Sequence, residues 1–266
     1  MVLNKNEKHK IMCASPFNPS EKIKLQICKK ELAINRSDVV IDLGCGIGRY
    51  SSELAKFAGK VIGMDLSLDS IRLAKQLFRL KNCDFICCDA THIPVKDSSI
   101  DKVSSVDVLE HIQDDNAVLD EIDRVLKPRR RIFLYVPCRN AFSLEWVDAK
   151  AKGTYPMYPI DIETGHVHRY KTKEILSLLE SVGFNQSSVK IRYFGHYAVP
   201  LLENLSFKVG RKFISQGAEN SRSLESYREY SNRLVQFSLF IVRILEYFDV
   251  LLERIPTASG MFIIIK

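Results

Sequence analysis

The feature that most constrains this chain is a run of buried-strand residues that leads directly into three closely spaced glycines. Residues 39–43 read Val-Val-Ile-Asp-Leu, and a helical stretch begins at Arg49. Between the two lie Gly44, Gly46 and Gly48. Glycine lets the backbone turn sharply and lets a ligand approach without interference from a Cβ atom. A strand, a glycine loop and a helix in this order predict a site for a nucleotide-like ligand.

Two acidic residues follow predicted strands at regular intervals beyond this loop. Asp65 comes directly after a strand predicted at 60–64 and 21 residues after Gly44. Asp89 comes directly after a strand predicted at 84–88 and 24 residues after Asp65. A carboxylate at the end of the second strand can accept hydrogen bonds from both ribose hydroxyls, and Asp89 is a candidate for an adenine amino group. Either acid could instead cap a helix, but three strand-end features in register favour binding.

Short β-rich runs alternate with helical stretches along much of the chain, which is typical of parallel βαβ units. We predict strands at 39–43, 60–64, 84–88, 101–105, 131–136, 188–193 and 261–265. We predict helices at 21–31, 49–57, 68–80, 115–126 and 172–182. Residues 137–170 lose the alternation and are expected to form a long functional loop.

The same pattern divides the chain into three parts. Residues 1–35 are expected to be an N-terminal helical leader, and residues 36–193 with 256–266 the core. Residues 194–255 are expected to be a helical insertion that serves as a lid, a substrate element or a dimer element. The apolar stripe at 234–255 would pack on the core, form a homodimer seam or line a greasy tunnel.

These motifs resemble those of the class I S-adenosylmethionine-dependent methyltransferases, in the broad group whose first motif is of the DLGCGxGR type. The matching segments are 42–48, Asp65, 89–90, 103–111 and 124–128. The resemblance implies an α/β, Rossmann-like sheet of seven strands in the order 3-2-1-4-5-7-6, with strand 7 antiparallel, helices on both faces and the helical insertion before the last strand. It also implies S-adenosylmethionine as cofactor and S-adenosylhomocysteine as product.

The resemblance assigns a set of residues to the cofactor. They are Asp42, Gly44, Cys45, Gly46, Gly48, Asp65, Leu66, Asp89, Ala90 and Val106. An NAD-dependent dehydrogenase is the competing interpretation of the loop. Its fingerprint G-x-G-x-x-G would need a glycine where Arg49 stands, so the methyl donor is favoured.

Histidines are the candidates for catalysis, although methyl transfer needs chiefly the placement of a nucleophile in line with the methyl group. His111, which follows the fourth predicted strand, could remove a proton from the acceptor or merely shape the pocket. His166 and His168 could do the same or cap the next helix. No third ligand accompanies them at a recognisable spacing, so we predict no metal. The candidates for acceptor binding are Tyr155, Tyr158, Arg169 and Tyr170.

The net charge and the cysteines of the sequence indicate which partners and which cellular location to expect. The net charge of +7 is spread along the chain, and its densest cluster at 127–131 is predicted to be a solvated turn rather than a phosphate-binding patch. Seven cysteines and no secretory leader favour a cytoplasmic location. Cys87 and Cys88 are predicted to be buried in a strand, with a redox or arsenic-type thiol site as the alternative.

The sequence therefore predicts a methyltransferase that acts on an O, N or C nucleophile of a small, hydrophobic or aromatic acceptor, including a lipid- or glycan-linked one. A tRNA or RNA methyltransferase is the alternative, although the basic residues do not cluster as nucleic-acid binding requires. A non-catalytic cofactor sensor or assembly partner is the alternative of another class. No transmembrane segment is expected, and peripheral membrane contact and a homodimer through 234–255 stay open.

Overall fold

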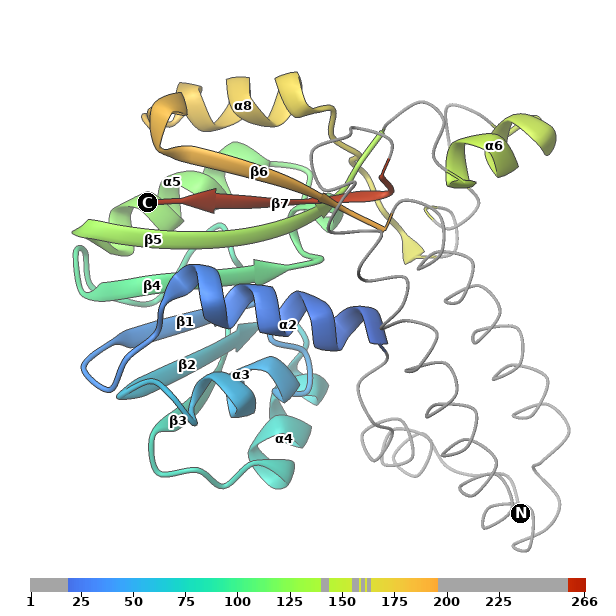
Figure 1. Ribbon diagram of the computed structural model, residues 1–266. Coiled ribbons are helices and arrows are strands. Elements are labelled where there is room, and N and C mark those ends of the chain that lie inside the picture. The colour runs from blue at the N-terminus through green and yellow to red at the C-terminus, as the bar shows by residue number, and fades with distance from the viewer. Residues whose placement is uncertain (1–18, 140–143, 155–157, 159–160, 162–163, 196–257) are drawn as a thin grey trace, which may run out of the picture.

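A seven-stranded sheet forms the centre of the described part of the chain (Figure 1). The computed structural model describes residues 19–139, 144–154, 158, 161, 164–195 and 258–266. The strand order is β3-β2-β1-β4-β5-β7-β6. The last strand in the chain, β7, runs antiparallel to both of its neighbours, and the remaining neighbouring pairs are parallel. This arrangement confirms the predicted sheet.

Six of the seven strands begin and end within one residue of the predicted bounds, because their apolar runs are bounded by turn residues. The strands are β1 (Val39–Leu43), β2 (Lys60–Asp65), β3 (Cys83–Cys87), β4 (Ile100–Val106), β5 (Leu126–Pro137), β6 (Val189–Phe194) and β7 (Gly260–Ile265). The exception is β5, which begins five residues before its predicted start.

The five helices predicted within the described residues are present, and two of them, α3 and α4, end three residues early. The helices are α2 (Pro19–Leu32), α3 (Arg49–Leu54), α4 (Leu68–Leu77), α5 (Asp115–Val125), α6 (Leu144–Ala151) and α8 (Thr172–Ser181), with 3-10 turns η1 (Leu109–His111) and η2 (Gln186–Ser188). The helix α6 corrects the expectation of an unstructured loop at 137–170. It spans only eight residues, and its apolar residues lie on more than one side of the helix, so periodicity gives a weak signal there.

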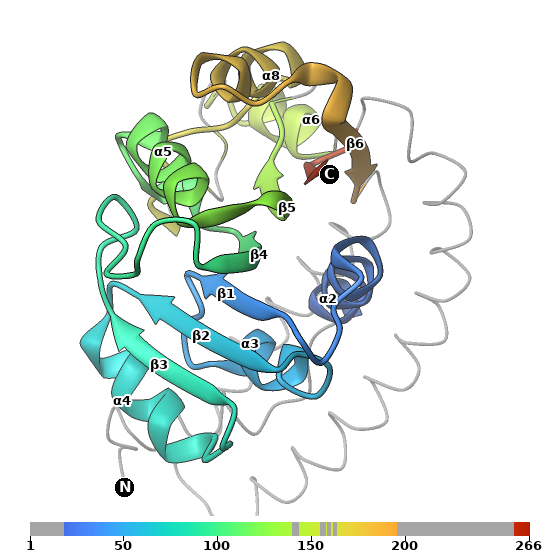
Figure 2. The same ribbon diagram turned by 90° about the vertical axis from the view of Figure 1, so that its left-hand side faces the viewer.

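Helices cover both faces of the sheet (Figure 2). One core is shared with α2, α3 and α4, and the other with α5 and α8. Strand β7 serves both cores, because Met261, Ile263 and Ile265 point into one and Phe262 and Ile264 into the other. Burial on both faces explains why this strand is apolar at every one of these positions.

An acid is buried where β1 packs on α3. Asp42 is 3% exposed and accepts a 2.6 Å hydrogen bond from the Ser51 hydroxyl. Burial raises the pKa of Asp42 to about 7, against the lowering by hydrogen bonds from Ser51. The Asp42 carboxyl therefore belongs to the packing of β1 on α3, and burial there favours its protonated form.

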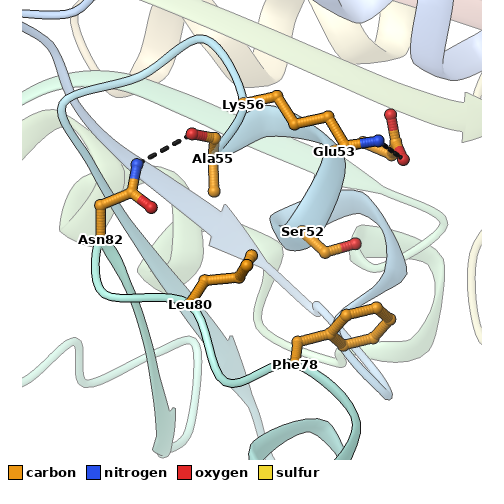
Figure 3. Close-up of a pocket in the computed structure, with 7 residues that line it drawn as sticks. All are labelled: Ser52, Glu53, Ala55, Lys56, Phe78, Leu80 and Asn82. Atoms are coloured by element: carbon orange, nitrogen blue, oxygen red, sulfur yellow. Dashed lines mark hydrogen bonds and ion pairs between the residues drawn. The ribbon is translucent and has the colours of Figure 1, made fainter.

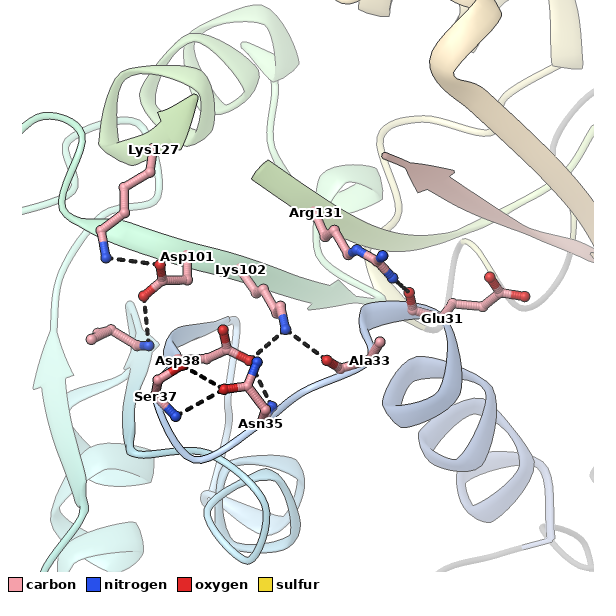
Figure 4. Close-up of polar contacts among 10 residues, drawn as sticks. Glu31, Ala33, Asn35, Ser37, Asp38, Asp101, Lys102, Lys127 and Arg131 are labelled. Atoms are coloured by element: carbon pink, nitrogen blue, oxygen red, sulfur yellow. Dashed lines mark hydrogen bonds and ion pairs between the residues drawn. The ribbon is translucent and has the colours of Figure 1, made fainter. Parts of the chain in front are cut away.

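The carboxyl end of α2 is tied to the far half of the sheet through Glu31. Its buried carboxylate lies 3.0 Å from the Lys190 ammonium, 3.3 Å from the Arg192 guanidinium and 3.2 Å from the Lys266 ammonium. Its backbone carbonyl accepts a hydrogen bond from Arg131 (Figure 4). Burial alone would raise the pKa of Glu31, but the hydrogen bonds from Lys190 and Lys266 outweigh it and lower the pKa.

A second cluster of polar residues joins the amino ends of β1, β4 and β5 (Figure 4). Lys102 of β4 forms a buried ion pair with Asp38, and its ammonium donates a 2.7 Å hydrogen bond to the Ala33 carbonyl. Asp101 accepts hydrogen bonds from the Val39 amide at 2.9 Å and from the Lys127 ammonium at 2.8 Å. These contacts fix β1 beside β4 and β5, and so fix the loop that follows β1.

The basic cluster at 127–131 lies within β5, which corrects the prediction of a turn between two elements. The ladder pairs Ile100 with Leu126 and then Lys102 with Arg131, so residues 127–130 interrupt the strand pairing as an irregularity. The strand continues on both sides of this interruption because each side pairs with β4.

The two adjacent cysteines correct another expectation, because neither is buried in a strand. Cys87 is the exposed last residue of β3, and its thiol donates a 3.4 Å hydrogen bond to the Leu66 carbonyl. Cys88 is half-buried and lies beyond the strand. The strand β3 is at the edge of the sheet, which leaves its end open to solvent.

The predicted insertion falls almost wholly outside the described residues. Strand β6 ends at Phe194, and residues 196–257 lie outside the described part of the chain. The apolar stripe at 234–255 therefore stays a prediction. The division of the chain at 1–35 and 194–255 likewise stays a prediction. Within the described ranges, no helix has the length and apolar character needed to span a bilayer.

We expect Glu31→Gln to lower the free energy of unfolding at pH 7 by about 2 kcal/mol, the size typical of hydrogen bonds to a charged group. A lowered pKa means that the folded state binds the proton less tightly than the unfolded state. The stabilisation is therefore present above a pH of about 4.3 and is lost as the pH falls through the folded-state pKa. Urea unfolding of the wild type and of Glu31→Gln at pH 3 and pH 7 measures the loss of unfolding free energy at each pH. The control is Glu53→Gln, which removes the exposed ion pair with Lys56. Equal losses at the two pH values would contradict this assignment.

Asp42 should give the opposite pH dependence. Because its pKa is raised to about 7, the folded state holds the proton more tightly than the unfolded state. The contribution of Asp42 is thus fully present below a pH of about 4 and is lost as the pH rises to about 7. Asp42→Asn, which cannot ionise, should flatten that part of the profile in urea unfolding, and Asp69→Asn on the exposed side of α4 should not. Parallel profiles for the wild type and Asp42→Asn would show that Asp42 is ionised in the fold.

Candidate functional site

The glycine loop turns at the carboxyl end of β1 in a conformation that requires glycine. Gly44 has a φ of +72°, and a Cβ atom there would lie 2.1 Å from the Val108 side chain. Gly48 has a φ of +82°, and its Cβ would lie 2.6 Å from the Phe85 ring. At Gly46, a Cβ would meet nothing within 4 Å. The outer glycines therefore pack on neighbouring elements, and the middle one borders open space that a ligand can use.

Asp65 joins this loop to the start of α4. Its Oδ2 accepts a 2.7 Å hydrogen bond from the Gly46 amide, and its Oδ1 accepts a 2.8 Å hydrogen bond from the amide of Ser67, the N-cap of α4. An ionised carboxylate has about four lone-pair sites, so about two remain for a ligand. The half-buried Asp65 is thus held in place by the backbone while keeping the capacity to bind two ribose hydroxyls.

The remaining residues predicted for the cofactor lie around the carboxyl ends of β2, β3 and β4. Leu66 is 72% exposed beside Asp65. Asp89 is exposed, and its Oδ1 accepts hydrogen bonds from the amide and hydroxyl of Thr91, which lower the pKa of Asp89. Ala90 is buried and Val106 half-buried. Exposed apolar and acidic groups at one sheet edge fit a nucleoside, which has an apolar face and polar edges.

Two residues of the predicted cofactor set, Asp42 and Cys45, have buried side chains that contribute to packing. Asp42 is buried against α3, as described above. Cys45 is buried, and burial raises the pKa of its thiol well above the ordinary value. The amide of Cys45 donates a 2.8 Å hydrogen bond to the Met64 carbonyl of β2, which closes the loop onto the sheet.

The N-terminal helix reaches the same sheet edge, which the sequence did not predict. Asp107 follows β4 with a φ of +55°, and its carboxylate lies 2.7 Å from the Lys24 ammonium of α2. The ammonium also lies 3.7 Å from the centre of the Tyr135 ring. A mostly buried cation is therefore placed beside the turn that leads to His111.

A returning segment brings His166 to His111. The amides of Val167 and His168 both donate to the Glu110 carbonyl, at 2.7 and 3.2 Å. The rings of His111 and His166 meet edge to face with their centres 4.8 Å apart. Burial lowers the pKa of His111, and the charge of His166 lowers it further. The structure thus joins two of the three predicted catalytic histidines.

His168 lies apart from this pair. Its Nε2 lies 3.3 Å from the Gln113 carbonyl, and its ring centre lies 5.8 Å from that of Tyr170. The helix α8 begins instead with Lys171 as N-cap, whose amide donates to the Glu174 carboxylate at 2.8 Å. The contacts of His168 are thus with the segment after η1.

The residues predicted for acceptor binding are engaged within the protein. The Nε of Arg169 donates to both oxygens of Asp161, at 2.7 and 2.8 Å, and its guanidinium lies 4.1 Å from the centre of the buried Tyr158 ring. The hydroxyl of Tyr170 donates a 2.9 Å hydrogen bond to Asp115. Tyr155 lies outside the described residues. Acceptor binding by these side chains stays a prediction.

A pocket near the amino end of β3 contains none of the residues predicted for the site (Figure 3). Its volume is about 280 Å³, and it lies between α3 and the segment that precedes β3. The lining residues are Ser52, Glu53, Ala55, Lys56, Phe78, Leu80 and Asn82. The side-chain amide of Asn82 donates a 2.8 Å hydrogen bond to the Ala55 carbonyl and thereby joins the two segments that line the pocket.

Residues 41–134 match a family described as methyltransferase domain. The chain is 32% identical over 161 residues to cycloartenol-C-24-methyltransferase of Arabidopsis thaliana, covering 58% of this chain and 46% of that protein. It is 36% identical over 106 residues to phosphoethanolamine N-methyltransferase 1 of Triticum aestivum, covering 37% of this chain and 21% of that protein. The chain thus spans less than half the length of these curated relatives.

Solved structures share the fold. Phosphoethanolamine N-methyltransferase 2 of Haemonchus contortus, with phosphomonomethylethanolamine and S-adenosylhomocysteine bound, aligns with a TM-score of 0.60 at 18% identity, over 92% of this chain and 52% of that one. The [4+2]-cyclase SpnF aligns with a TM-score of 0.56 at 17% identity, over 91% of this chain and 77% of that one. Residues 41–134 thus match a methyltransferase domain, and the sheet order together with these alignments shows that the chain has the fold of the class I S-adenosylmethionine-dependent methyltransferases.

Proposed function

We propose that this protein transfers a methyl group from S-adenosylmethionine to an O, N or C nucleophile of a small, hydrophobic or aromatic acceptor, including a lipid- or glycan-linked one. The observation that carries the proposal is the Asp65 carboxylate, which is hydrogen-bonded to the Gly46 amide of the glycine loop and retains acceptor capacity for a ribose. Two relatives that are named for a sterol and for phosphoethanolamine support a small-molecule acceptor. Because the chain spans less than half of each, their acceptors do not carry over.

The cofactor supplies a methyl group that is already activated, so the chain's own residues have mainly to bind and orient. Gly46 would leave room for the cofactor at the loop, Asp65 would accept hydrogen bonds from its ribose, and Leu66 and Asp89 would bind its adenine. His111 and His166 stand on the acceptor side, at the end of β4, where either ring can take a proton from an acceptor hydroxyl or ammonium.

Two other functions remain as outcomes of the same experiments. One alternative is that this protein binds the cofactor without transferring its methyl group. It is kept because the chain shares its fold with a protein named as a [4+2]-cyclase rather than as a methyltransferase. Cofactor binding without transfer to any acceptor would favour that sensor-like or non-methylating function. Transfer to tRNA, with affinity that falls steeply with salt, would favour the RNA methyltransferase.

We expect Asp65→Ala to weaken S-adenosylhomocysteine binding by about 10- to 100-fold, because hydrogen bonds to a charged group contribute about 1.5–3 kcal/mol. Calorimetric titration measures the affinity. Asp69→Ala, which removes an exposed carboxylate from the next helical turn, is the matched control and should bind like the wild type. Unchanged affinity in Asp65→Ala would mean that the ribose site lies elsewhere.

We expect His111→Ala and His166→Ala to lower turnover by about 100-fold or more if a histidine removes the acceptor proton, with cofactor affinity nearly unchanged. Transfer from labelled donor to a panel of sterols, phenols and amines measures turnover. His168→Ala, whose ring lies apart from the pair, should have a smaller effect. A parallel loss of cofactor affinity in the first two variants would instead show that the histidines support the fold.

A further inference from the structure

Three side chains with metal-ligating atoms meet at the end of β4. One ligand atom each of Glu110, His111 and His166 lies within 4.8 Å of the others. Glu110 and His111 belong to η1, and His166 belongs to the segment whose amides bind the Glu110 carbonyl. The backbone therefore holds the three residues together although they are 56 positions apart in the chain.

The carboxylate of Glu110 is the unusual member of this group. The residue is fully buried, and neither of its side-chain oxygens accepts a hydrogen bond from another residue in the described part of the chain. Burying a carboxyl group without a partner is unfavourable, and such groups are normally paired or coordinate a metal. A cation between Glu110 and the two histidines would supply the missing partner.

The His166 imidazole is oriented as a metal-ligating histidine usually is. The Nδ1 of His166 lies 2.8 Å from the Asp161 carboxylate, and Asp161 is itself held by Arg169. A metal-ligating histidine typically donates its second ring N–H to a carboxylate or a backbone carbonyl, which directs the other nitrogen at the ion. The ring of His166 has such an outer partner in Asp161.

We propose that Glu110, His111 and His166 bind one divalent transition-metal ion, of which Zn²⁺ is the type best suited to two imidazoles and a carboxylate. Tetrahedral ligands at the usual bond lengths lie about 3.4 Å apart, so the widest pair has to close by about 1.4 Å at most. His111 is exposed and can make that movement. Three protein ligands leave a fourth position for water or an acceptor oxygen, as in catalytic rather than structural zinc sites.

This ion would lie beside the acceptor side of the proposed methyltransferase site. It would occupy the ring nitrogens of His111 and His166 and would take over their role there, because a bound metal lowers the pKa of an oxygen that coordinates it. The existence of the metal site does not rest on the proposed function. The sequence could not reveal it, because the third ligand is not near His166 and His168 along the chain. His168 is not a member of the group, since its Nε2 is at the Gln113 carbonyl. The ligand set therefore differs from the pair of histidines that the sequence offered.

The test uses the full chain, stripped of metal with a chelator, dialysed and titrated without S-adenosylmethionine. Calorimetry with Zn²⁺ and visible absorbance with Co²⁺ should both show one ion per chain. Glu110→Gln and His166→Gln should each weaken binding by about 100-fold or more and abolish the Co²⁺ absorbance. Asp161→Asn, which loosens the outer partner, should weaken binding by about 10- to 100-fold. His168→Gln is the matched control and should bind like the wild type.

Thermal unfolding of each variant shows whether it is folded, and the partly exposed His166 offers a second variant if Glu110→Gln does not fold. Absence of a stoichiometric ion in the wild type would overturn the proposal. Equal affinity of the wild type and folded His166→Gln would also overturn it. Because donor binding and methyl transfer are measured separately, either result leaves the proposed function to its own tests.

Discussion

The hydrogen bond from the Gly46 amide to the Asp65 carboxylate is the contact on which the account of this protein depends. It joins the loop after β1 to the end of β2, the two neighbouring strands whose carboxyl ends form the expected cofactor site. The loop can take this path because Gly44 and Gly48 adopt positive φ values and because a side chain at either position would collide with Val108 or Phe85. Backbone geometry, rather than a set of polar side chains, thus shapes the site.

The sheet edge is fixed from the opposite end. The buried Lys102–Asp38 pair and the hydrogen bonds of Asp101 hold β1 against β4 at their amino ends. The Glu31 carboxylate draws α2 against β6 and the end of β7. With α2 anchored there, its Lys24 reaches Asp107 at the carboxyl edge. The contacts that stabilise the fold are therefore also those that place a cation beside the site.

Much of the fold could be predicted from the sequence because its signals are local. Apolar runs bounded by turns located the strands, and the doubly buried β7 was recognisable from its unbroken apolar run. The failures occurred where a local signal was missing or ambiguous. The helix α6 has no apolar face of its own, the basic residues at 127–131 are polar although they continue β5, and Cys87 is apolar although it ends an edge strand.

The site divides in the same way. The glycine loop, Asp65 and Asp89 follow strands directly, so their shared edge could be inferred from the order of elements. Glu110 and His111 lie close to His166 because the segment around His166, 56 positions after Glu110, returns to η1 and is held there by backbone hydrogen bonds. No spacing in the sequence encodes this contact. The same is true of Asp161, which orients His166 and pairs with the Arg169 that the sequence assigned to an acceptor.

A crystal structure of the full chain with S-adenosylhomocysteine bound tests the central claim most directly. We expect both ribose hydroxyls within hydrogen-bonding distance of the Asp65 carboxylate, the adenine beside Leu66 and Asp89, and the sulfur atom directed toward the end of β4 and His111. A nucleoside bound away from Asp65, or a complex in which the Asp65 carboxylate contacts neither hydroxyl, would contradict it.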